Sequence, residues 1–462
     1  MDGPGVLVVS KCLSAAAIVD SLLSGDRYAP KLYVAERQLN PYNLKRATSH
    51  RVIPDLNRAA VAAFAERFRG NIDFGLTDTE DFVTAWGREL LAKAGVQMLC
   101  VSRKFAVERS KAGQRALFRR IFKGANPPFR IFDPGRFRDH ERAVQEFKKT
   151  MEELGPVVIK PDAPARGAGV GVWGGDFSTS DGAIAFFRNV LSKGKVLVEA
   201  VVKGEESSFH AFSDGKHFVP APLSRDYKRS LEGNKGKLTG GMGSYRGPDD
   251  HLPFLARADY EDIVRAEEAS FRKWRGRGSE PGLRGIILYD AIMHTGKGFK
   301  VLERNSRGGN TESINLYTTL EDDFIDVCHR MLDGSLKGIR FSNMASVVTC
   351  AVPLAYGIEG KAPVGGAKVD MTKAVELARK SGGDVRVYPM DVRLEGGQTL
   401  MGASRTVAVV GLGPDLEVAR SRSLEACRGI AGPLRWRSDI ASTQDVNRSR
   451  RHLRRLRDAS SV

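Results

Sequence analysis

VVIKPDAPARGAGVGVW, residues Val157–Trp173, is the stretch that decides the fold predicted for this chain of 462 residues. Its β-branched start predicts a buried strand that brings Lys160 to the strand's end. Gly167, Gly169 and Gly171 follow, and glycines allow positive φ and let backbone N–H groups approach phosphate oxygens closely. The stretch therefore predicts a loop for nucleotide phosphates, with Lys160 on the α- and β-phosphates. A glycine-rich hairpin with an exposed lysine is the alternative for this stretch taken alone.

A second stretch, KVLERNSRGGNTE at Lys300–Glu312, predicts a metal site. It begins within the second of two adjacent predicted strands, GIILYDAIMH and KGFKVLERNS, and continues past the end of that strand. Glu303 and Asn305 are two positions apart, so both project from one strand face. Such oxygen ligands can hold Mg²⁺ or Mn²⁺, while triphosphate oxygens and water complete the coordination. Arg307, on the same face, can meet a transferring phosphoryl group or a substrate anion. Ordinary polar strand surface is the alternative.

The rest of the pattern predicts α/β organisation. Strands at Val6–Ser10, Lys31–Glu36 and Ile72–Leu76 alternate with helices, which is typical of a parallel sheet covered by helices. A helix over Lys104–Lys123 leads into an NPP turn, which marks a boundary. Towards the C-terminus the chain becomes strand-rich again, before a helix at Leu416–Arg428.

Composition indicates a globular chain. Of its residues 42% are hydrophobic. The longest apolar runs are far shorter than the roughly 18 residues of a membrane helix, so we expect no membrane partner. The N-terminal residues lack the basic lead and apolar run of a secretory signal, so we expect none. The 5 cysteines stand singly, without the spacings of a zinc site or a redox pair. We therefore expect a cytoplasmic location.

The formal charge of +17 favours two different interpretations. A basic surface attracts phosphate whatever its sequence, so a non-catalytic nucleotide or nucleic-acid binder is one of them. An enzyme for polyanionic small molecules is the other, and we favour it because no aromatic RNA-reading motif accompanies the arginines.

Six arginines lie within Arg448–Arg457, in the segment NRSRRHLRRLRD. Few apolar residues interrupt them, which favours a disordered tail over a basic helix that binds acidic partners, RNA or anionic surfaces.

Two further segments make the pattern specific. KVLVEAVVKGEESSF carries Glu199 and Glu206, and DYKR at Asp226–Arg229 precedes TGGMGSY at Thr239–Tyr245. With the phosphate loop and the metal stretch, these segments resemble the ATP-grasp family and, within it, the phosphoribosylamine–glycine ligases. ERSKAGQRALFRR, around Lys111, and the C-terminal DVRLEGGQTLMGASRTVAVVGLG resemble the same family. The likeness extends over most of the chain.

The resemblance implies an α/β ATP-grasp fold with an N-terminal parallel-sheet (pre-ATP-grasp) domain and a C-terminal β-rich domain. The implied boundaries are 1–102 for the N-terminal α/β domain, 103–335 for the ATP-grasp domain with a small lid subdomain at about 128–200, 336–441 for the β-rich domain and 442–462 for the basic tail.

The resemblance also implies an ATP-dependent ligase. Such an enzyme joins glycine to 5-phosphoribosylamine through an acyl phosphate in purine synthesis, with ATP and Mg²⁺ or Mn²⁺. Its glycine-rich loop would close over the acyl phosphate and exclude water. We expect small-molecule substrates, a monomer or homodimer, and no nucleic acid. The implied cofactor-binding residues are Lys111, Lys160, Arg166, Gly167, Gly169, Glu199 (adenine) and Glu206 (ribose), the metal ligands are Glu303 and Asn305, and the catalytic residues are Asp226, Lys228, Arg229 and Arg307.

The chain departs from the family's pattern at several positions. Ala168 replaces a lysine of the phosphate loop, and Arg166 can restore the charge. Tyr227 replaces a histidine and Asn310 an aspartate, and the first helix opens with SKCLSAA, where Lys11 can hold a phosphate. A ligase paralogue with another amine acceptor or another acid therefore stays open as an alternative.

Overall fold

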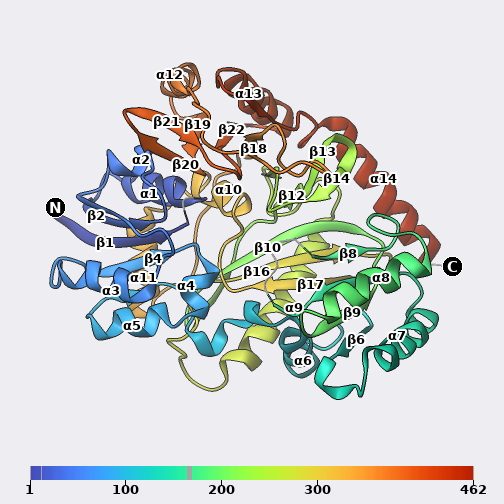
Figure 1. The fold of residues 1–462 in the computed structure, drawn as a ribbon. Coiled ribbons are helices and arrows are strands. Elements are labelled where there is room, and N and C mark those ends of the chain that lie inside the picture. The colour runs from blue at the N-terminus through green and yellow to red at the C-terminus, as the bar shows by residue number, and fades with distance from the viewer. Residues whose placement is uncertain (1, 12, 164–168, 461–462) are drawn as a thin grey trace.

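The computed structural model describes residues 2–11, 13–163 and 169–460, and it opens with a parallel five-stranded sheet in the order β3-β2-β1-β4-β5 (Figure 1). Its elements are β1 (Asp2–Ser10), β2 (Ala29–Glu36), β3 (Ser49–Val52), β4 (Phe74–Thr77), β5 (Gln97–Met98), α1 (Ala15–Leu23), α2 (Pro41–Leu44), α3 (Arg58–Glu66), α4 (Glu80–Thr84) and α5 (Gly87–Lys93). On β1, Leu7 and Val9 join the core formed with α3 and α5, whereas Val6 and Val8 join the core formed with α1. Both faces of the strand are covered, so the whole run is apolar. The predicted parallel sheet is confirmed.

The helix predicted over Lys104–Lys123 is shorter than expected, because its first part is not α-helical. The residues before it form two 3₁₀ turns, η1 (Arg103–Phe105) and η2 (Val107–Arg109). The helix itself, α6 (Lys111–Ile121), follows Ser110, whose backbone is extended and whose hydroxyl accepts a hydrogen bond from Gly113 N at 2.9 Å. Serine is a favoured N-cap because its oxygen satisfies an N–H that has no partner within the helix.

Two antiparallel sheets form the middle of the chain. The first has the order β6-β9-β7-β8, and Phe132, Phe147 and Phe187 stack in its core. Its elements are β6 (Phe129–Phe132), η3 (Pro134–Arg136), α7 (His140–Leu154), β7 (Val157–Pro161), β8 (Gly171–Val172), α8 (Ser180–Leu191) and β9 (Val196–Ala200). The second has the order β11-β10-β16-β17, and its last two strands are the adjacent pair predicted from the sequence. Its elements are β10 (Glu205–Asp214), β11 (Phe218–Pro220), α9 (Arg257–Arg275), β16 (Arg284–His294), β17 (Phe299–Asn305), α10 (Glu312–Thr318) and α11 (Phe324–Asp333).

The C-terminal part is an antiparallel sheet in the order β12-β15-β18-β22-β19, with β23 beside β18. Its elements are β12 (Arg225–Asp226), β15 (Gly243–Arg246), β18 (Ala345–Pro353), α12 (Thr372–Lys380), β19 (Val385–Pro389), β22 (Val407–Gly413), α13 (Leu416–Arg428) and β23 (Leu434–Arg435). Two hairpins adjoin it, β13 (Arg229–Leu231) with β14 (Lys235–Leu238), joined by η4 (Glu232–Asn234), and β20 (Val392–Glu395) with β21 (Gln398–Met401).

The segment predicted as a flexible closing loop is therefore partly a buried strand. β12 and β15 pair with each other, and β15 pairs with β18. Tyr245, at the end of the TGGMGSY string, is fully buried. Only its first residues, at Thr239 and Gly240, line the central cavity.

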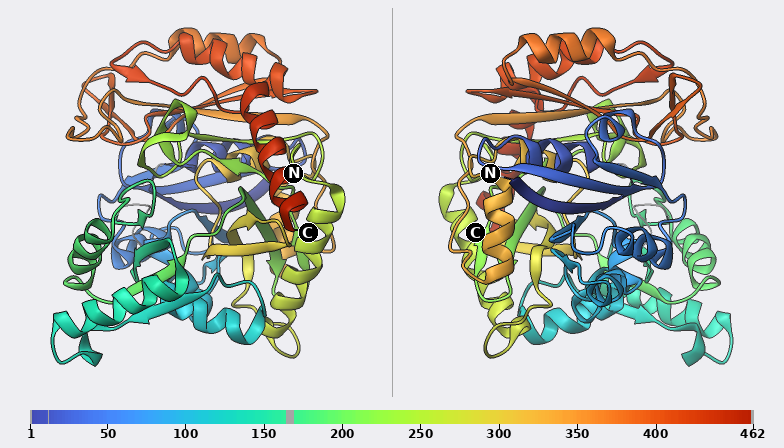
Figure 2. Two further views of the ribbon diagram at one scale, coloured as in Figure 1. Left: turned by 90° about the vertical axis from the view of Figure 1, so that its right-hand side faces the viewer. Right: turned by 90° about the vertical axis from the view of Figure 1, so that its left-hand side faces the viewer.

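The arginine-rich tail is an ordered helix, α14 (Thr443–Ser460), so the prediction of disorder is wrong. Asp445, Val446, Ser449 and Leu453 are buried at helical spacing, and the exposed arginines occupy the other face. Figure 2 shows α14 running from the C-terminal sheet down along α9. In the described part of the chain, no helix is long and apolar enough to cross a membrane.

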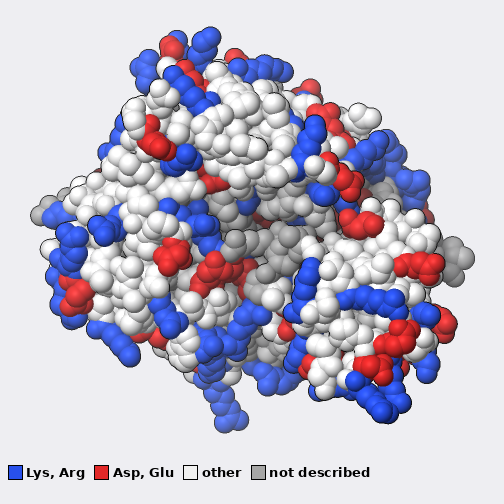
Figure 3. Space-filling view, viewed as in Figure 1, with Lys and Arg blue, Asp and Glu red and all other residues white. Residues whose placement is uncertain are grey.

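On the face drawn in Figure 3, basic residues are spread out rather than gathered in one stripe. In this view lysines and arginines surround the molecule and alternate with acidic residues. Several other arginines are fully buried and serve ion pairs in the interior, among them Arg115 and Arg304. The charge of +17 is thus shared between an internal and a dispersed external population.

Arg304 ties three elements together behind the central sheet. From β17, its Nη2 lies 2.6 Å from Asp290 Oδ2 of β16 and also binds Glu267 of α9. None of the three side chains is exposed. Buried charges are costly unless paired, so this network stabilises the sheet only while all three partners are present.

We predict that Arg304→Met lowers the free energy of unfolding by about 3–5 kcal/mol, because it leaves two buried carboxylates without a cation. Urea denaturation of the purified protein measures this loss. Arg272→Met, which removes an exposed pair with Glu268 on the same helix α9, is the matched control and should change stability little. Equal effects of the two substitutions would contradict the stated role of Arg304.

Candidate active site

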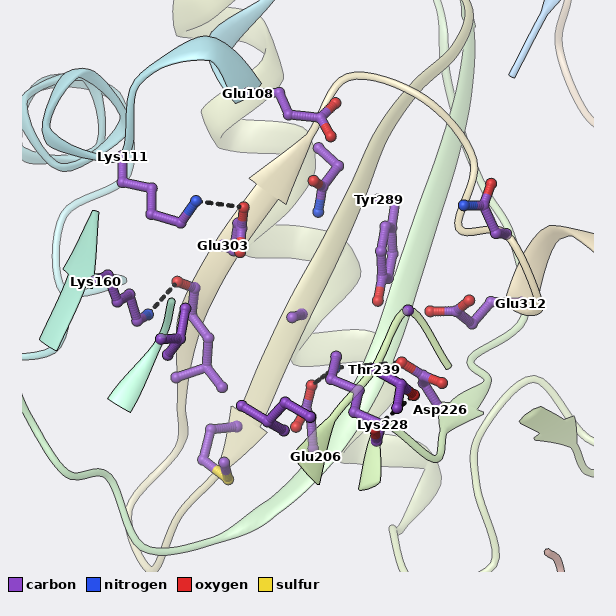
Figure 4. A pocket seen from close by; sticks show the side chains of 18 of the residues that line it. Glu108, Lys111, Lys160, Glu206, Asp226, Lys228, Thr239, Tyr289, Glu303 and Glu312 are labelled. Carbon is purple, nitrogen blue, oxygen red and sulfur yellow. Dashed lines mark hydrogen bonds and ion pairs between the residues drawn. The ribbon is translucent and has the colours of Figure 1, made fainter. Parts of the chain in front are cut away.

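A cavity of about 370 Å³ lies where the two central sheets meet the N-terminal and C-terminal parts of the chain (Figure 4). Of the residues predicted from the sequence, the cavity is lined by Lys111, Lys160, Glu199, Glu206, Asp226, Lys228, Glu303, Asn305 and Arg307. Gly169 and Arg229 are not among its lining residues. Arg166, Gly167 and Ala168 lie outside the described residues.

One end of the cavity is apolar. The segment Ala200–Val202, at the end of β9, forms one wall. Further apolar lining residues come from both central sheets and the turn before β6, among them Pro127, Val158, Val172, Met293 and Leu302. An apolar slot edged by a few charged groups suits a planar base such as adenine.

Glu199 and Lys160 form an ion pair at the edge of this slot. Lys160 Nζ lies 2.6 Å from Glu199 Oε2 and donates to the Leu302 carbonyl at 3.2 Å. Arg115 also binds Glu199 and donates to the Val301 carbonyl at 2.9 Å. Burial raises the pKa of Glu199, but the two cations outweigh burial and hold the pKa below its ordinary value. The ion pair holds Lys160 between the apolar slot and the face of β17 that carries Glu303 and Asn305.

Glu303 and Asn305 both line the cavity, as the strand alternation predicted. Glu303 Oε1 lies 3.3 Å from Lys111 Nζ at the start of α6. Burial raises the pKa of Glu303, but Lys111 and Lys160 outweigh burial and hold the pKa below its ordinary value, so the carboxylate is ionised at neutral pH. A carboxylate and an amide oxygen on one face fit Mg²⁺, which prefers oxygen ligands and needs few from the protein when phosphates supply others. Among the described residues no cluster of three or more His, Cys, Asp or Glu could hold a metal by itself.

Arg307 is held by two carboxylates that the sequence did not single out. Its Nη2 lies 2.9 Å from Glu108 Oε1 and its Nε 3.4 Å from Glu80 Oε2. Burial raises the pKa of Glu108 to about 6, with Arg307 opposing the shift and Glu80 adding to it. Lys11, a candidate phosphate ligand, also lines the cavity and lies 3.1 Å from Glu80.

The DYKR segment contributes Asp226 and Lys228. Lys228 binds Glu206 and lies 3.5 Å from Asp226 Oδ2. Burial raises the pKa of Asp226 to about 7, with the charge of Glu312 adding to the shift and Lys228 opposing it. Arg229 points elsewhere, donating to the Gly236 carbonyl at 2.8 Å and lying 3.9 Å from Asp176.

Other lining residues escaped the sequence interpretation. Tyr289 lies on β16 opposite Asn305, Glu312 ends the predicted metal stretch, and Arg405 reaches the cavity from the C-terminal part, where it donates to the Gly240 carbonyl. Arg405 lies in the C-terminal segment that resembles the family, but it stands in no phosphate-binding or metal-binding pattern. Tyr289 and Glu312 were within reach of the sequence argument, because Tyr289 lies in the predicted strand pair and Glu312 in the metal stretch itself.

Two antiparallel sheets that enclose paired lysines, a carboxylate–amide pair and an arginine define an ATP-grasp enzyme, a class that binds ATP. A profile of the family described as "Phosphoribosylglycinamide synthetase, ATP-grasp (A) domain" matches residues 119–313.

Known proteins resemble nearly the whole chain. The phosphoribosylamine–glycine ligase of Pyrococcus furiosus is 30% identical over 444 residues, covering 96% of this chain and 95% of that protein. That of Methanopyrus kandleri is 31% identical over 465 residues, covering 98% and 99%. The crystal structure of the Thermotoga maritima ligase has a TM-score of 0.72 at 20% identity, covering 94% of this chain and 100% of that one. This chain therefore belongs to the phosphoribosylamine–glycine ligase family.

The raised pKa of Asp226 gives a prediction about stability and pH. A carboxyl whose pKa rises on folding from its ordinary value of 3.8 to about 7 favours folding at low pH, and that contribution is lost as pH rises through 7. Asp226→Asn removes this loss. The melting temperature of the variant minus that of the unaltered protein should therefore increase from pH 5 to pH 8. Calorimetry without ligands measures this difference. The exposed Asp458→Asn is the control, and a pH-independent difference for Asp226→Asn would contradict the prediction.

Proposed function

We propose that the enzyme activates the carboxylate of glycine with ATP and transfers the acyl group to the amine of 5-phosphoribosylamine, giving glycinamide ribonucleotide, ADP and phosphate. The supporting observation is that one cavity joins an apolar slot, Lys111 and Lys160, the Glu303–Asn305 pair and Arg307. This set can hold a nucleotide and a small anionic acid side by side, which is the main requirement for phosphoryl transfer.

The first step is attack of a glycine carboxylate oxygen on the γ-phosphorus. Glu303 and Asn305 would hold Mg²⁺ or Mn²⁺, which supplies charge neutralisation on the terminal phosphates. Lys160 and Lys111 bind phosphate oxygens, and Lys111 exchanges its present contact with Glu303 for them. Arg307, oriented by Glu108, offsets negative charge on the transferring group and the acid. The bond to the leaving ADP oxygen breaks as the acyl phosphate forms.

The second step is attack of the neutral amine on the acyl carbon. Its electron pair forms the new C–N bond, and phosphate leaves with the C–O bond pair. Lys11 and Arg405 line the same cavity and supply positive charge for the phosphate of the amine substrate. Thr239 and Gly240 cover the cavity beside Lys228, where they limit access of water to the acyl phosphate. The amine arrives neutral, and the proton that its nitrogen loses on forming the amide passes to the departing phosphate, so the step needs no protein base.

The cysteines support a cytoplasmic setting for this reaction. Cys100, Cys328, Cys350 and Cys427 are free and buried. Single thiols of this kind suit a reducing compartment.

ADP release from purified enzyme tests the proposed function. Release should require glycine, Mg²⁺ and phosphoribosylamine formed in situ from ribose 5-phosphate and ammonia. Hydroxylamine in place of the amine should give glycine hydroxamate if the acyl phosphate forms. Hydroxamate without any response to phosphoribosylamine would favour the paralogue with another acceptor. Failure of both reactions would contradict the proposal.

We predict that Glu303→Gln lowers turnover by about 100-fold or more at saturating Mg²⁺, because it removes the negative charge of the metal pair. The fold should persist, since glutamine has the same shape, and circular dichroism checks this. Glu268→Gln, an exposed carboxylate outside the cavity, is the matched control. Unchanged turnover in Glu303→Gln would exclude Glu303 as a metal ligand.

A further inference from the structure

The C-terminal helix α14 contacts the back of two segments whose front lines the cavity. Neighbouring residues of extended backbone face opposite sides. The cavity is lined by Glu206, Asp226 and Lys228, whereas the residues that alternate with them and contact α14 are Glu205, Arg225 and Tyr227. Figure 2 shows α14 lying along the outside of the molecule.

Tyr227 makes the most buried of these contacts. Its hydroxyl donates to Asp445 Oδ2 at 2.7 Å and accepts from Ala441 N at 3.0 Å. Tyr227 is 4% exposed and Asp445 6% exposed, so water does not replace either partner. Arg437 lies over the Tyr227 ring, with its guanidinium carbon 4.9 Å from the ring centroid.

Two further contacts join α14 to the residues beside Asp226 and Glu206. Arg225 Nη1 donates to Ser449 Oγ at 2.7 Å, and Arg225 Nη2 lies 2.8 Å from Glu205 Oε2. His452 Nδ1 of α14 lies 2.6 Å from the other oxygen, Glu205 Oε1. The helix therefore contacts Glu205, Arg225 and Tyr227, each of which is next in the chain to a cavity-facing side chain.

We propose that Asp445 is a positioning residue for the ligase reaction, acting through Tyr227 on Asp226 and Lys228. This inference rests on the proposed function, because it assigns those two cavity residues to the reacting site. β12 is only two residues long, so side-chain contacts carry more of its position than a long strand would require. α14 then serves as part of the active-site framework, although none of its described residues lines the cavity.

The test compares Tyr227→Phe, Asp445→Ala and Asp445→Asn in steady-state kinetics with glycine, ATP and phosphoribosylamine, well below their melting temperatures. Tyr227→Phe and Asp445→Ala should each lower kcat by about tenfold or more, since small misplacements of reacting groups are costly. Asp445→Asn keeps an acceptor oxygen and should retain most activity. The double variant Tyr227→Phe with Asp445→Ala should be no worse than the poorer single variant, because both remove one hydrogen bond.

Arg450→Ala is the matched control, because Arg450 lies on the same helix but donates to the Pro253 carbonyl and to Asn447 Oδ1, neither of which lines the cavity. It should leave kcat unchanged. Normal kcat in folded Asp445→Ala, additive losses in the double variant, or full activity in Lys228→Met would each overturn the inference. The turnover of the unaltered enzyme with glycine, ATP and phosphoribosylamine tests the proposed function. The ratio of kcat between each variant and the unaltered enzyme tests the role of Asp445.

Discussion

Alternation of side chains along extended backbone is the constraint on which the arrangement of the site depends. On β17, Glu303 and Asn305 line the cavity, and Arg304 between them is buried against Asp290 and Glu267. The same arrangement recurs at the cavity's other wall, where Asp226 and Lys228 alternate with Arg225 and Tyr227. Each cavity-facing pair is thus positioned by a polar neighbour that is buried on the opposite side. Hydrogen bonds and ion pairs are directional, so these buried neighbours fix the orientation of the strand. Apolar packing alone would bury the strand without fixing its orientation.

The charged side chains of the cavity lie close to one another. The pKa values of its carboxyl groups therefore differ from one group to the next. Glu303 lies between Lys111 and Lys160 and keeps a pKa below its ordinary value. Glu108 shares Arg307 with Glu80, so burial dominates and raises its pKa to about 6. Lys111 and Lys160 already neutralise carboxylates in the structure without ligands. In the proposed mechanism, binding of a nucleoside triphosphate exchanges these internal ion pairs for phosphate contacts, which lowers the net gain in binding free energy but keeps the cations oriented beforehand.

The sequence predicted those parts of the structure that local chemistry decides. A short local pattern of apolar residues was enough to predict three elements, namely the strand at Val6–Val9, the strand pair ending at Asn305 and the helix Leu416–Arg428. It failed where a long-range partner decides. α14 is polar over most of its length. Its few apolar side chains, Val446 and Leu453, stabilise a helix only because they pack against β10 and its neighbours. Arg405 and Glu108 lie in segments that resemble the family, but neither stands in a phosphate-binding or metal-binding pattern, and their place in the cavity becomes visible only in the fold.

A strongly basic chain need not bind nucleic acid, because arginine can serve the interior as well as the surface. Arg115, Arg225, Arg304 and Arg307 each pair with a buried carboxylate around the cavity or behind its walls. Arginine suits this use, since its planar guanidinium stays charged and binds several oxygens in a fixed geometry. The acidic residues that a site for ATP and metal requires thus demand compensating cations in the surrounding layers. Part of the positive charge is therefore a structural consequence of the acidic cavity wall, and it orients the groups that meet an anionic substrate.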